Sequence, residues 1–346
     1  MGDVLMASTL ANNLKRFNSS FSIYFLCYTH HAQIIATNPN IDQIIKVEEK
    51  KLKTFSGLIQ TINHIRKEKF DILIDPYEKT QSKLISKFSS IPMRISYPKK
   101  DFFGNYTHVI NPKSISKTSA GLALDNRLAL IDPIIDSSFQ KDYIHPLFLK
   151  KEEIDHGEKI LKEGNISFTK PIVMLGVLGS KEEKTYPLSY MGQIINTILE
   201  NRDIDVLFNY IPKQKDQIDL LMSSIDPKHH SKIHLNIIGK SIREFASIMY
   251  HCDLHISNEG GGCHISKALN KPTFTIFSPY IKVEDWNTFS DNELFSYSDL
   301  KQIKPELFEN ETQKQWRKRS LELYKAYKPM LIIAKIENFM KKHLKF

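Results

Sequence analysis

The chain has 346 residues, of which 41% are hydrophobic and 25% are charged, and its formal charge is +9. This length is typical of about two globular domains, and the composition excludes a disordered or low-complexity protein. The longest apolar runs, residues 171–179 and 329–336, are far shorter than the ~20 residues of a membrane-spanning helix. Three cysteines without a CxxC pair exclude a disulfide scaffold and indicate reduced thiols in a cytoplasmic protein.

The positive charge allows two interpretations. It reflects either a lysine-rich coding bias or a partner with negative charge, such as a phosphorylated substrate or an anionic membrane surface. The basic segments contain no nucleic-acid-binding motif and no interleaved aromatic residues, so we expect no nucleic-acid partner.

The first part of the chain opens with a predicted helix at residues 4–17 that has no strand before it. A doubly wound α/β domain normally begins with a strand. We therefore expect the first N-terminal strand to be missing from this chain, with further residues upstream. Short apolar runs and helical periodicity then alternate. The predicted strands are residues 21–28, 43–47, 70–75, 93–97 and 107–110, and the predicted helices are residues 54–67 and 80–88.

A second alternating series follows residue 150, and its helix at residues 241–250 has a capping-box start, Ser241 to Glu244. Residues 315–342 predict one or two long helices. The fold class is therefore α/β, with a parallel sheet in each of two domains, residues 1–145 and 146–346. The other predicted elements of this series are strands at residues 171–178, 205–210, 233–238, 253–258 and 272–277, and helices at residues 189–201, 214–224 and 263–270.

The stretch NEGGGCHISKAL, residues 258–269, places three of the chain's 13 glycines between a predicted strand and a predicted helix. Ligands of open α/β sheets bind beyond the carboxyl ends of the strands. Glycines there let the backbone approach a ligand, and a helix N-terminus offers free N–H groups to an anion. A tight turn with packing glycines is the alternative. We favour a phosphate or nucleotide site that includes Glu259, Gly260, Gly261, Gly262 and His264.

A second loop, residues 176–187, also follows a predicted strand. It contains Gly179 and Ser180, the lysines Lys181 and Lys184, and a proline before the next helix. A solvated charged loop is one interpretation. A lysine that reaches a diphosphate is the other, because a point charge on a flexible stem suits that task.

Asp3 follows Gly2 directly before the first helix. An aspartate in this position is commonly an N-cap. At the carboxyl end of a first strand, however, its carboxylate would face a ligand and would serve as a general base.

Three elements together resemble glycosyltransferase family 9, the ADP-heptose–lipopolysaccharide heptosyltransferases. The first is Gly2-Asp3-Val4, and the second is Lys184-Thr185-Tyr186-Pro187. The third is the segment of residues 241–279, in which Glu259, Gly261 and His264 follow the family's D-x-G-x-x-H pattern. The resemblance covers nearly the whole chain, and the third element is its most specific part.

The resemblance implies a GT-B fold, with two Rossmann-like domains facing across a cleft and no metal or cofactor. It implies that the C-terminal domain binds an ADP-sugar donor and the N-terminal domain binds a lipopolysaccharide core or lipid A acceptor. Residues 315–343 would pack back on the N-terminal domain. The implied catalytic residues are Asp3, as base, and Lys184. The implied donor-binding residues are Gly179, Ser180, Lys184, Glu259, Gly260, Gly261, Gly262 and His264.

The implied place of action is the cytoplasmic face of the bacterial inner membrane, with peripheral attachment through basic and apolar surface. Glu259 and Tyr186 replace the family's usual aspartate and tryptophan, and residues 278–286 lack its glycine and threonine. Two alternatives follow from these departures. One is a transferase of the same fold that uses another nucleotide sugar, a hexose or an N-acetylhexosamine, and the other is a non-catalytic nucleotide-sugar-binding homologue.

Overall fold

The computed structural model describes residues 1–98 and 104–344, so residues 99–103 and 345–346 of the predicted domain ranges lie outside the described residues. The chain divides into two compact units. The first unit contains Asp3–Phe148 together with Asp285–Thr288, and the second contains Leu149–Glu284 and the chain from Phe289 onward. The predicted binding roles of the two domains stay predictions, as does the expected return of the C-terminal helices to the first domain.

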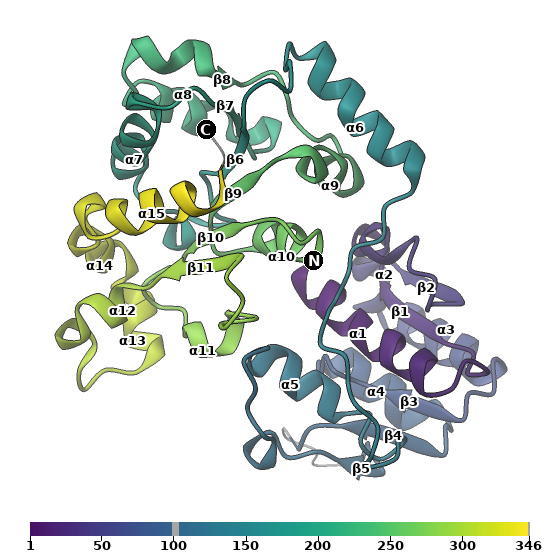
Figure 1. Cartoon of the computed structure of the whole chain (residues 1–346). Coiled ribbons are helices and arrows are strands. Elements are labelled where there is room, and N and C mark those ends of the chain that lie inside the picture. The colour runs from purple at the N-terminus through teal and green to yellow at the C-terminus, as the bar shows by residue number, and fades with distance from the viewer. Residues whose placement is uncertain (99–103, 345–346) are drawn as a thin grey trace. The chain divides into compact units, whose positions relative to one another are not determined.

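The first unit alternates helices and parallel strands, as the hydrophobic pattern predicted (Figure 1). Its first helix has the acidic Asp3 in its first turn and the basic Lys15 and Arg16 in its last turn, which suits the helix dipole. The elements are α1 (Gly2–Phe17), β1 (Tyr24–Tyr28), a 3-10 helix (Thr29–Ile35), β2 (Gln43–Val47), α2 (Glu49–Leu52), α3 (Phe55–Lys67), β3 (Ile72–Ile74), α4 (Thr80–Phe88), β4 (Met93–Ser96), β5 (His108–Val109), a 3-10 helix (Pro112–Ser114) and α5 (Leu122–Ala129).

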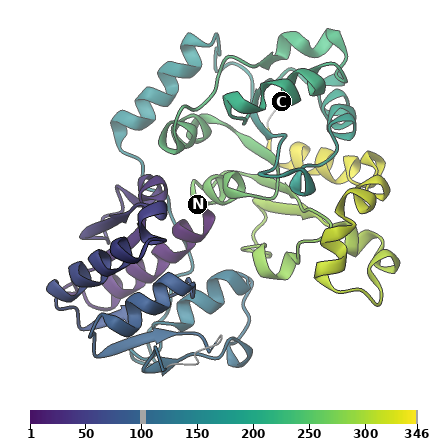
Figure 2. The same ribbon diagram turned by 180° about the vertical axis from the view of Figure 1, so that it is seen from behind.

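Helices cover both faces of the strands in the first unit. Helix α1 lies in front of them in Figure 1, and α3 and α4 lie in front in the reverse view of Figure 2. Leu10 and Leu14 of α1 share one apolar cluster with Ile95 of β4. A second cluster joins Ile62 and Ile65 of α3 to β1, β2 and β3 on the other face. Strands buried on both faces are typical of a doubly wound fold.

The strands of the first unit form two separate parallel sheets, β1-β2 and β3-β4-β5. Side chains of β1 and β3 nevertheless pack against the same cluster of apolar residues. Among the described residues no strand pairs with the remaining edges of β1 and β3.

The second unit contains one six-stranded sheet and its covering helices (Figure 1). The elements are α6 (Lys151–Glu163), β6 (Ile172–Gly176), a 3-10 helix (Glu182–Lys184), α7 (Leu188–Glu200), β7 (Asp205–Phe208), a 3-10 helix (Pro212–Gln214), α8 (Lys215–Met222), a 3-10 helix (Pro227–Lys232), β8 (Ile233–His234), α9 (Ile242–His251), β9 (Leu254–Asn258), α10 (Gly261–Ala268), β10 (Thr273–Ile276), α11 (Val283–Trp286), β11 (Phe295–Ser298), α12 (Leu300–Ile303), a 3-10 helix (Pro305–Phe308), α13 (Gln313–Lys318), α14 (Ser320–Ala326), a 3-10 helix (Pro329–Leu331) and α15 (Ile333–His343). The short helix α11 begins in the second unit and ends at Asp285 and Trp286, which belong to the first.

All strands of this sheet are parallel, in the order β11-β10-β9-β6-β7-β8. Counted along the second unit, this is the order 6-5-4-1-2-3, the doubly wound arrangement with its switch point between the first and fourth strands. Strands β6 and β9 are buried along their whole length, so the loops that follow them are held by rigid elements.

Three predictions about the second unit need correction. Residues 315–342 form three short helices, α13, α14 and α15, because the chain turns at Tyr327 and Pro329 cannot continue a helix. The predicted strand at residues 233–238 shortens to Ile233–His234. Ser241 caps α9 by accepting from the Glu244 amide at 3.1 Å, but the Glu244 carboxylate accepts from the Lys240 amide instead of closing the box.

Candidate active site

The glycine loop lies at the carboxyl end of β9, where α10 begins at Gly261. Gly260 has an extended backbone that any residue adopts, and a Cβ atom added to it meets nothing within 4 Å. The N–H groups of Gly260, Gly261 and Gly262 have no hydrogen-bond partner among the residues that the structure describes. Protein contacts therefore do not require glycine at position 260, and the open space and free N–H groups suit a bound anion.

The loop after β6 has a different reason for its glycine. A Cβ atom on Gly179 would lie 2.3 Å from the carbonyl oxygen of Lys184, so a side chain cannot be accommodated there. The Gly179 amide donates to Thr185 Oγ1 at 3.0 Å, and that hydroxyl donates to the Lys181 carbonyl at 2.9 Å. These bonds close the loop on itself, with Ser180 exposed at its tip.

Asn258, the last residue of β9, ties the two loops together. Its side-chain oxygen accepts from the Tyr186 amide at 2.8 Å, and its side-chain nitrogen donates to the Gly176 carbonyl at 2.9 Å. The residue is 3% exposed, so both bonds are shielded from water. Sequence reasoning missed this role, although a polar residue that ends a buried strand between two glycine loops is a usable signal.

The predicted residues Lys184 and Glu259 form an ion pair. Lys184 Nζ lies 3.0 Å from Glu259 Oε2, and the two side chains are 26% and 9% exposed. We expected these two residues to contact the donor separately. Each one neutralises the other, so an anion that recruits Lys184 would have to compete with Glu259.

A second cation lies beside this pair and was not predicted. Arg317, at 53% side-chain exposure, donates to Glu183 at 2.7 Å and its guanidinium lies over the Tyr280 ring at 5.6 Å. Burial raises the pKa of Tyr280, whereas the charges of Lys184 and Arg317 act in the opposite direction. The lysine, the arginine and the tyrosine therefore share one neighbourhood at the carboxyl edge of the sheet.

Two buried histidines lie next to the glycine loop. His264, on the first turn of α10, is 6% exposed, and its predicted contact with a phosphate stays a prediction. His255 of β9 is fully buried, and burial lowers its pKa to about 3. Its Nδ1 lies 3.0 Å from Ser266 Oγ. A Cβ atom added to Gly262 would lie 3.4 Å from the His255 Cε1 atom. A neutral imidazole thus packs beneath the loop.

Asp3 belongs to the first unit, in the first turn of α1. The N-cap of that helix is Met1, so the alternative interpretation of Asp3 as an N-cap is wrong. Its Oδ1 accepts from Arg127 Nη2 at 2.5 Å, and the side chains of Asp3 and Arg127 are 56% and 13% exposed. Arg127, which sequence reasoning missed, therefore orients an exposed carboxylate through one oxygen.

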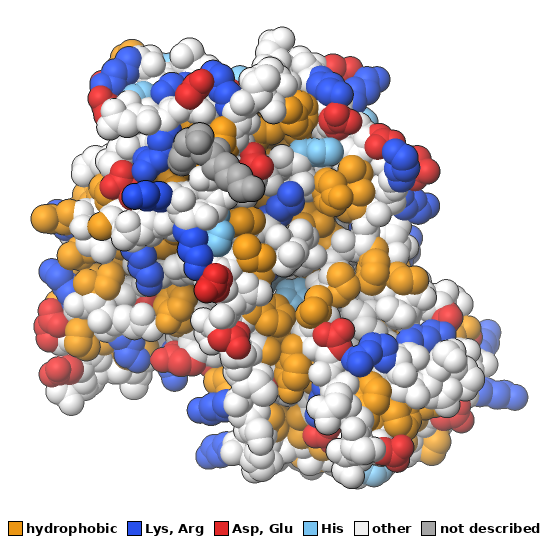
Figure 3. Space-filling model, in the orientation of Figure 1, with side chains coloured by type: hydrophobic (Ala, Val, Ile, Leu, Met, Phe, Trp, Pro, Cys, Tyr) orange, Lys and Arg blue, Asp and Glu red, His pale blue; other side chains and the backbone are white. Residues whose placement is uncertain are grey.

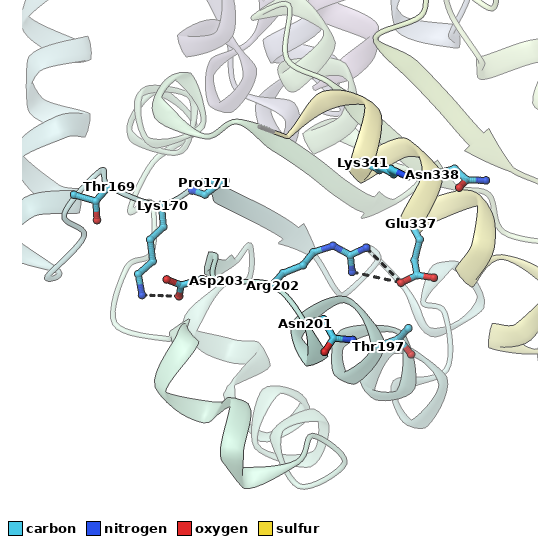
Figure 4. Close-up of a pocket in the computed structure, with 10 residues that line it drawn as sticks. All are labelled: Thr169, Lys170, Pro171, Thr197, Asn201, Arg202, Asp203, Glu337, Asn338 and Lys341. Carbon is cyan, nitrogen blue, oxygen red and sulfur yellow. Dashed lines mark hydrogen bonds and ion pairs between the residues drawn. The ribbon is translucent and has the colours of Figure 1, made fainter. Parts of the chain in front are cut away.

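A hollow of about 760 Å³ lies elsewhere in the second unit, beside the amino end of β6 (Figure 4). Two of its cations are neutralised: Lys170 pairs with Asp203 at 2.7 Å, and Arg202 pairs with Glu337 at 3.4 Å. Ligands of parallel α/β sheets bind at the carboxyl edge. The hollow is therefore not the candidate site.

Three further observations bear on cofactors and membranes. Within residues 1–98 and 104–344 no group of three or more His, Cys, Asp or Glu side chains is arranged to hold a metal ion. None of the helices described in these ranges is long and apolar enough to span a membrane. On the face shown in Figure 3, lysine and arginine side chains alternate with acidic ones and do not form a single basic field.

Known proteins resemble this chain over most of its length. The profile of "Glycosyltransferase family 9 (heptosyltransferase)" matches residues 59–317. Lipopolysaccharide heptosyltransferase 3 of Escherichia coli is 19% identical over 305 residues, which cover 84% of this chain and 84% of that protein.

Solved structures show the same fold. The glycosyl transferase family 9 protein from Veillonella parvula DSM 2008 has a TM-score of 0.76 at 13% identity and covers 99% of this chain and 94% of its own. E. coli heptosyltransferase WaaC with ADP-2-deoxy-2-fluoro heptose has a TM-score of 0.61 at 13% identity, over 86% and 89% of the two chains. The GT-B fold class predicted from the motifs is confirmed. The family profile matches well over half of the chain, and the chain therefore belongs to glycosyltransferase family 9 (heptosyltransferase).

Proposed function

We propose that this glycosyltransferase moves heptose from ADP-heptose to the lipopolysaccharide inner core, with inversion and without a metal ion. The carrying observation is the pairing of Lys184 with Glu259 beside the free N–H groups of Gly260, Gly261 and Gly262. The names of the relatives support this choice of donor and acceptor: one is a lipopolysaccharide heptosyltransferase, and one was solved with an ADP-heptose analogue.

The proposed reaction is a single displacement. An acceptor hydroxyl oxygen attacks the anomeric carbon as the bond to the diphosphate oxygen breaks, and the electron pair leaves with ADP. Asp3 takes the hydroxyl proton on the carboxylate that Arg127 orients. The developing charge on the diphosphate is stabilised by Lys184 and by the N–H groups at the start of α10, which are already positioned before the reaction.

Glu259 has two successive roles in this scheme. Before the donor binds, it holds Lys184 in the loop. Once the diphosphate recruits the lysine, the carboxylate is released and accepts hydrogen bonds from hydroxyls of the donor sugar or the ribose. The exchange replaces one charge-assisted contact with others, so it avoids a buried unpaired charge.

A second candidate is a transferase of the same fold that uses another nucleotide sugar. Glu259 favours this candidate. Its side chain is one methylene longer than the family's aspartate, so its carboxylate would meet hydroxyls of the donor at a different position. For either donor, we propose action at the cytoplasmic face of the inner membrane. The formal charge of +9 supports peripheral attraction to an anionic surface.

The test is a thermal-shift panel with ADP, ADP-heptose, UDP, UDP-sugars, GDP and NAD. The proposal expects stabilisation by ADP and larger stabilisation by ADP-heptose, because ligands that bind only the folded state raise its stability. Stabilisation by UDP-sugars alone would replace heptose with another sugar. The absence of any shift would leave the glycine loop as a structural turn.

A further inference from the structure

The carboxyl ends of β1 and β3 in the first unit carry a cluster of aromatic side chains that the mechanism above does not use. The Tyr28 and His30 rings are stacked, with centroids 5.7 Å apart and planes 12° from parallel. Tyr77 meets Tyr28 edge-on at 6.4 Å, and its side chain is 50% exposed. Exposed apolar residues that stand alone are ordinary on a protein surface, whereas contiguous ones can mark a ligand-binding surface.

The loop that presents Tyr77 is held rigidly. Asp75, 4% exposed, accepts from the amides of Tyr77 and Glu78 at 2.9 and 3.0 Å, and from the Tyr106 hydroxyl at 2.6 Å. Glu78 adopts a φ of +50°, in the left-handed region that a residue with a side chain enters at a cost. A strained residue fixed by a buried carboxylate points to a loop whose shape matters for binding.

The cluster adjoins the proposed general base. The His30 and His31 rings are 4.0 Å apart. Burial lowers the pKa of His31 to about 4, whereas the charges of Asp3 and Glu49 act in the opposite direction. Asp3 lies in the first turn of α1, and α1 leads into β1, so Asp3 is at the same edge of the strands as the carboxyl ends of β1 and β3. The His31 imidazole stays neutral near pH 7 and can exchange hydrogen bonds with a hydroxyl.

We propose that Tyr28, His30 and Tyr77 form a stacking surface for the acceptor, a pyranose ring with an anionic substituent, beside Asp3. The C–H face of such a ring packs on aromatic rings, and its hydroxyl then points toward the base. Lys79, exposed and 5.7 Å from the Tyr77 ring centroid, supplies the cation for the phosphate or carboxylate substituent. The inference rests on the proposed function, because it needs a sugar acceptor.

Tyr77→Ala is the main test, because half of this side chain is exposed and its loss leaves the core intact. The matched control is Phe88→Ala: Phe88 is 46% exposed at the far end of α4, which runs back from the same loop. We expect Tyr77→Ala to raise the KM for a phosphorylated, deacylated inner-core oligosaccharide by about tenfold, with the Kd of ADP unchanged. Tyr77→Trp should restore most of the loss, and Lys79→Met should abolish the preference for the phosphorylated oligosaccharide over its dephosphorylated form.

Binding of the same oligosaccharide without donor, measured by saturation-transfer NMR, separates this inference from the proposed function. If the oligosaccharide binds only when Tyr77 is present but no heptose is transferred, the stacking surface is supported and the proposed heptosyl transfer is refuted. If heptose is transferred and Tyr77→Ala leaves the KM for the oligosaccharide unchanged, the proposed reaction is supported and the stacking surface is refuted. Wild-type protein that neither binds nor modifies the oligosaccharide would overturn the surface as well.

Discussion

Replacing Lys184 by methionine tests the ion pair on which the donor site depends. Removing one partner of a buried pair leaves an uncompensated charge and costs about 3–5 kcal/mol. Lys184 is 26% exposed and Glu259 is 9% exposed, so water reaches one side of the 3.0 Å contact. We therefore expect a loss of about 2 kcal/mol in the free energy of unfolding. For a unit of ~200 residues this lowers the Tm by about 4–8 °C.

Glu259→Gln is the matched control, because it keeps the side-chain shape and leaves a lysine that can extend into water. Its expected loss is below ~1 kcal/mol, and the double variant should recover most of the stability of the wild type. ADP affinity should behave differently. Lys184→Met weakens ADP binding by about 10–100-fold, and the double variant does not recover it. Glu259→Gln alone should tighten ADP binding, because the side chain no longer competes for the lysine and its amide oxygen still accepts a hydrogen bond from a ribose hydroxyl.

Urea unfolding and isothermal titration calorimetry with ADP measure the two quantities separately. An ADP affinity that Lys184→Met leaves intact would show that the lysine has only a structural role. Destabilisations that simply add in the double variant would refute the argument from the ion pair, because the two side chains would then be energetically independent.

Three other perturbations have defined outcomes. Gly260→Val should weaken ADP binding at least ~10-fold in calorimetry while the Tm stays within ~1 °C, because its Cβ enters open space; unchanged affinity would mean that no ligand approaches there. Acidification from about pH 7 to about pH 5 should lower the free energy of unfolding by about 2 kcal/mol through His255, whose folded-state pKa of about 3 keeps it neutral while the unfolded chain binds a proton. In urea unfolding, His255→Gln should not show this loss of stability on acidification, and a pH dependence equal to that of the wild type would contradict the role given to His255. An extension of ~5 β-branched apolar residues fused before Met1 should stabilise the first unit by pairing with the open edges of β1 and β3. The control is the same extension with prolines, which cannot pair, and equal denaturation midpoints for the two proteins would contradict the expected strand pairing.

The donor loops could be predicted because their signal is local. Three consecutive glycines after a buried strand, and a lysine in the next glycine loop, are visible within about ten residues of sequence. The same holds for most strands and helices, whose apolar periodicity follows from burial on both faces of each sheet. A proline at position 329 was equally visible as a helix breaker, and the long-helix prediction overlooked it.

The contacts that assemble the site could not be predicted in this way. Asn258 bonds to Gly176 and Tyr186, more than 70 residues away, and Asp3 pairs with an arginine 124 residues along the chain. Such partners depend on the order of strands in the sheet, which a single sequence does not reveal. Strand β11 (Phe295–Ser298) escaped prediction because a sheet edge demands little hydrophobicity.

The most direct test of heptose transfer is to incubate the protein with ADP-heptose and deacylated inner-core oligosaccharide and to analyse the products by mass spectrometry. We expect an oligosaccharide heavier by one heptose, release of ADP, and loss of this product in Asp3→Ala while ADP still binds. An unmodified oligosaccharide in the presence of bound ADP-heptose, or full turnover by Asp3→Ala, would contradict it.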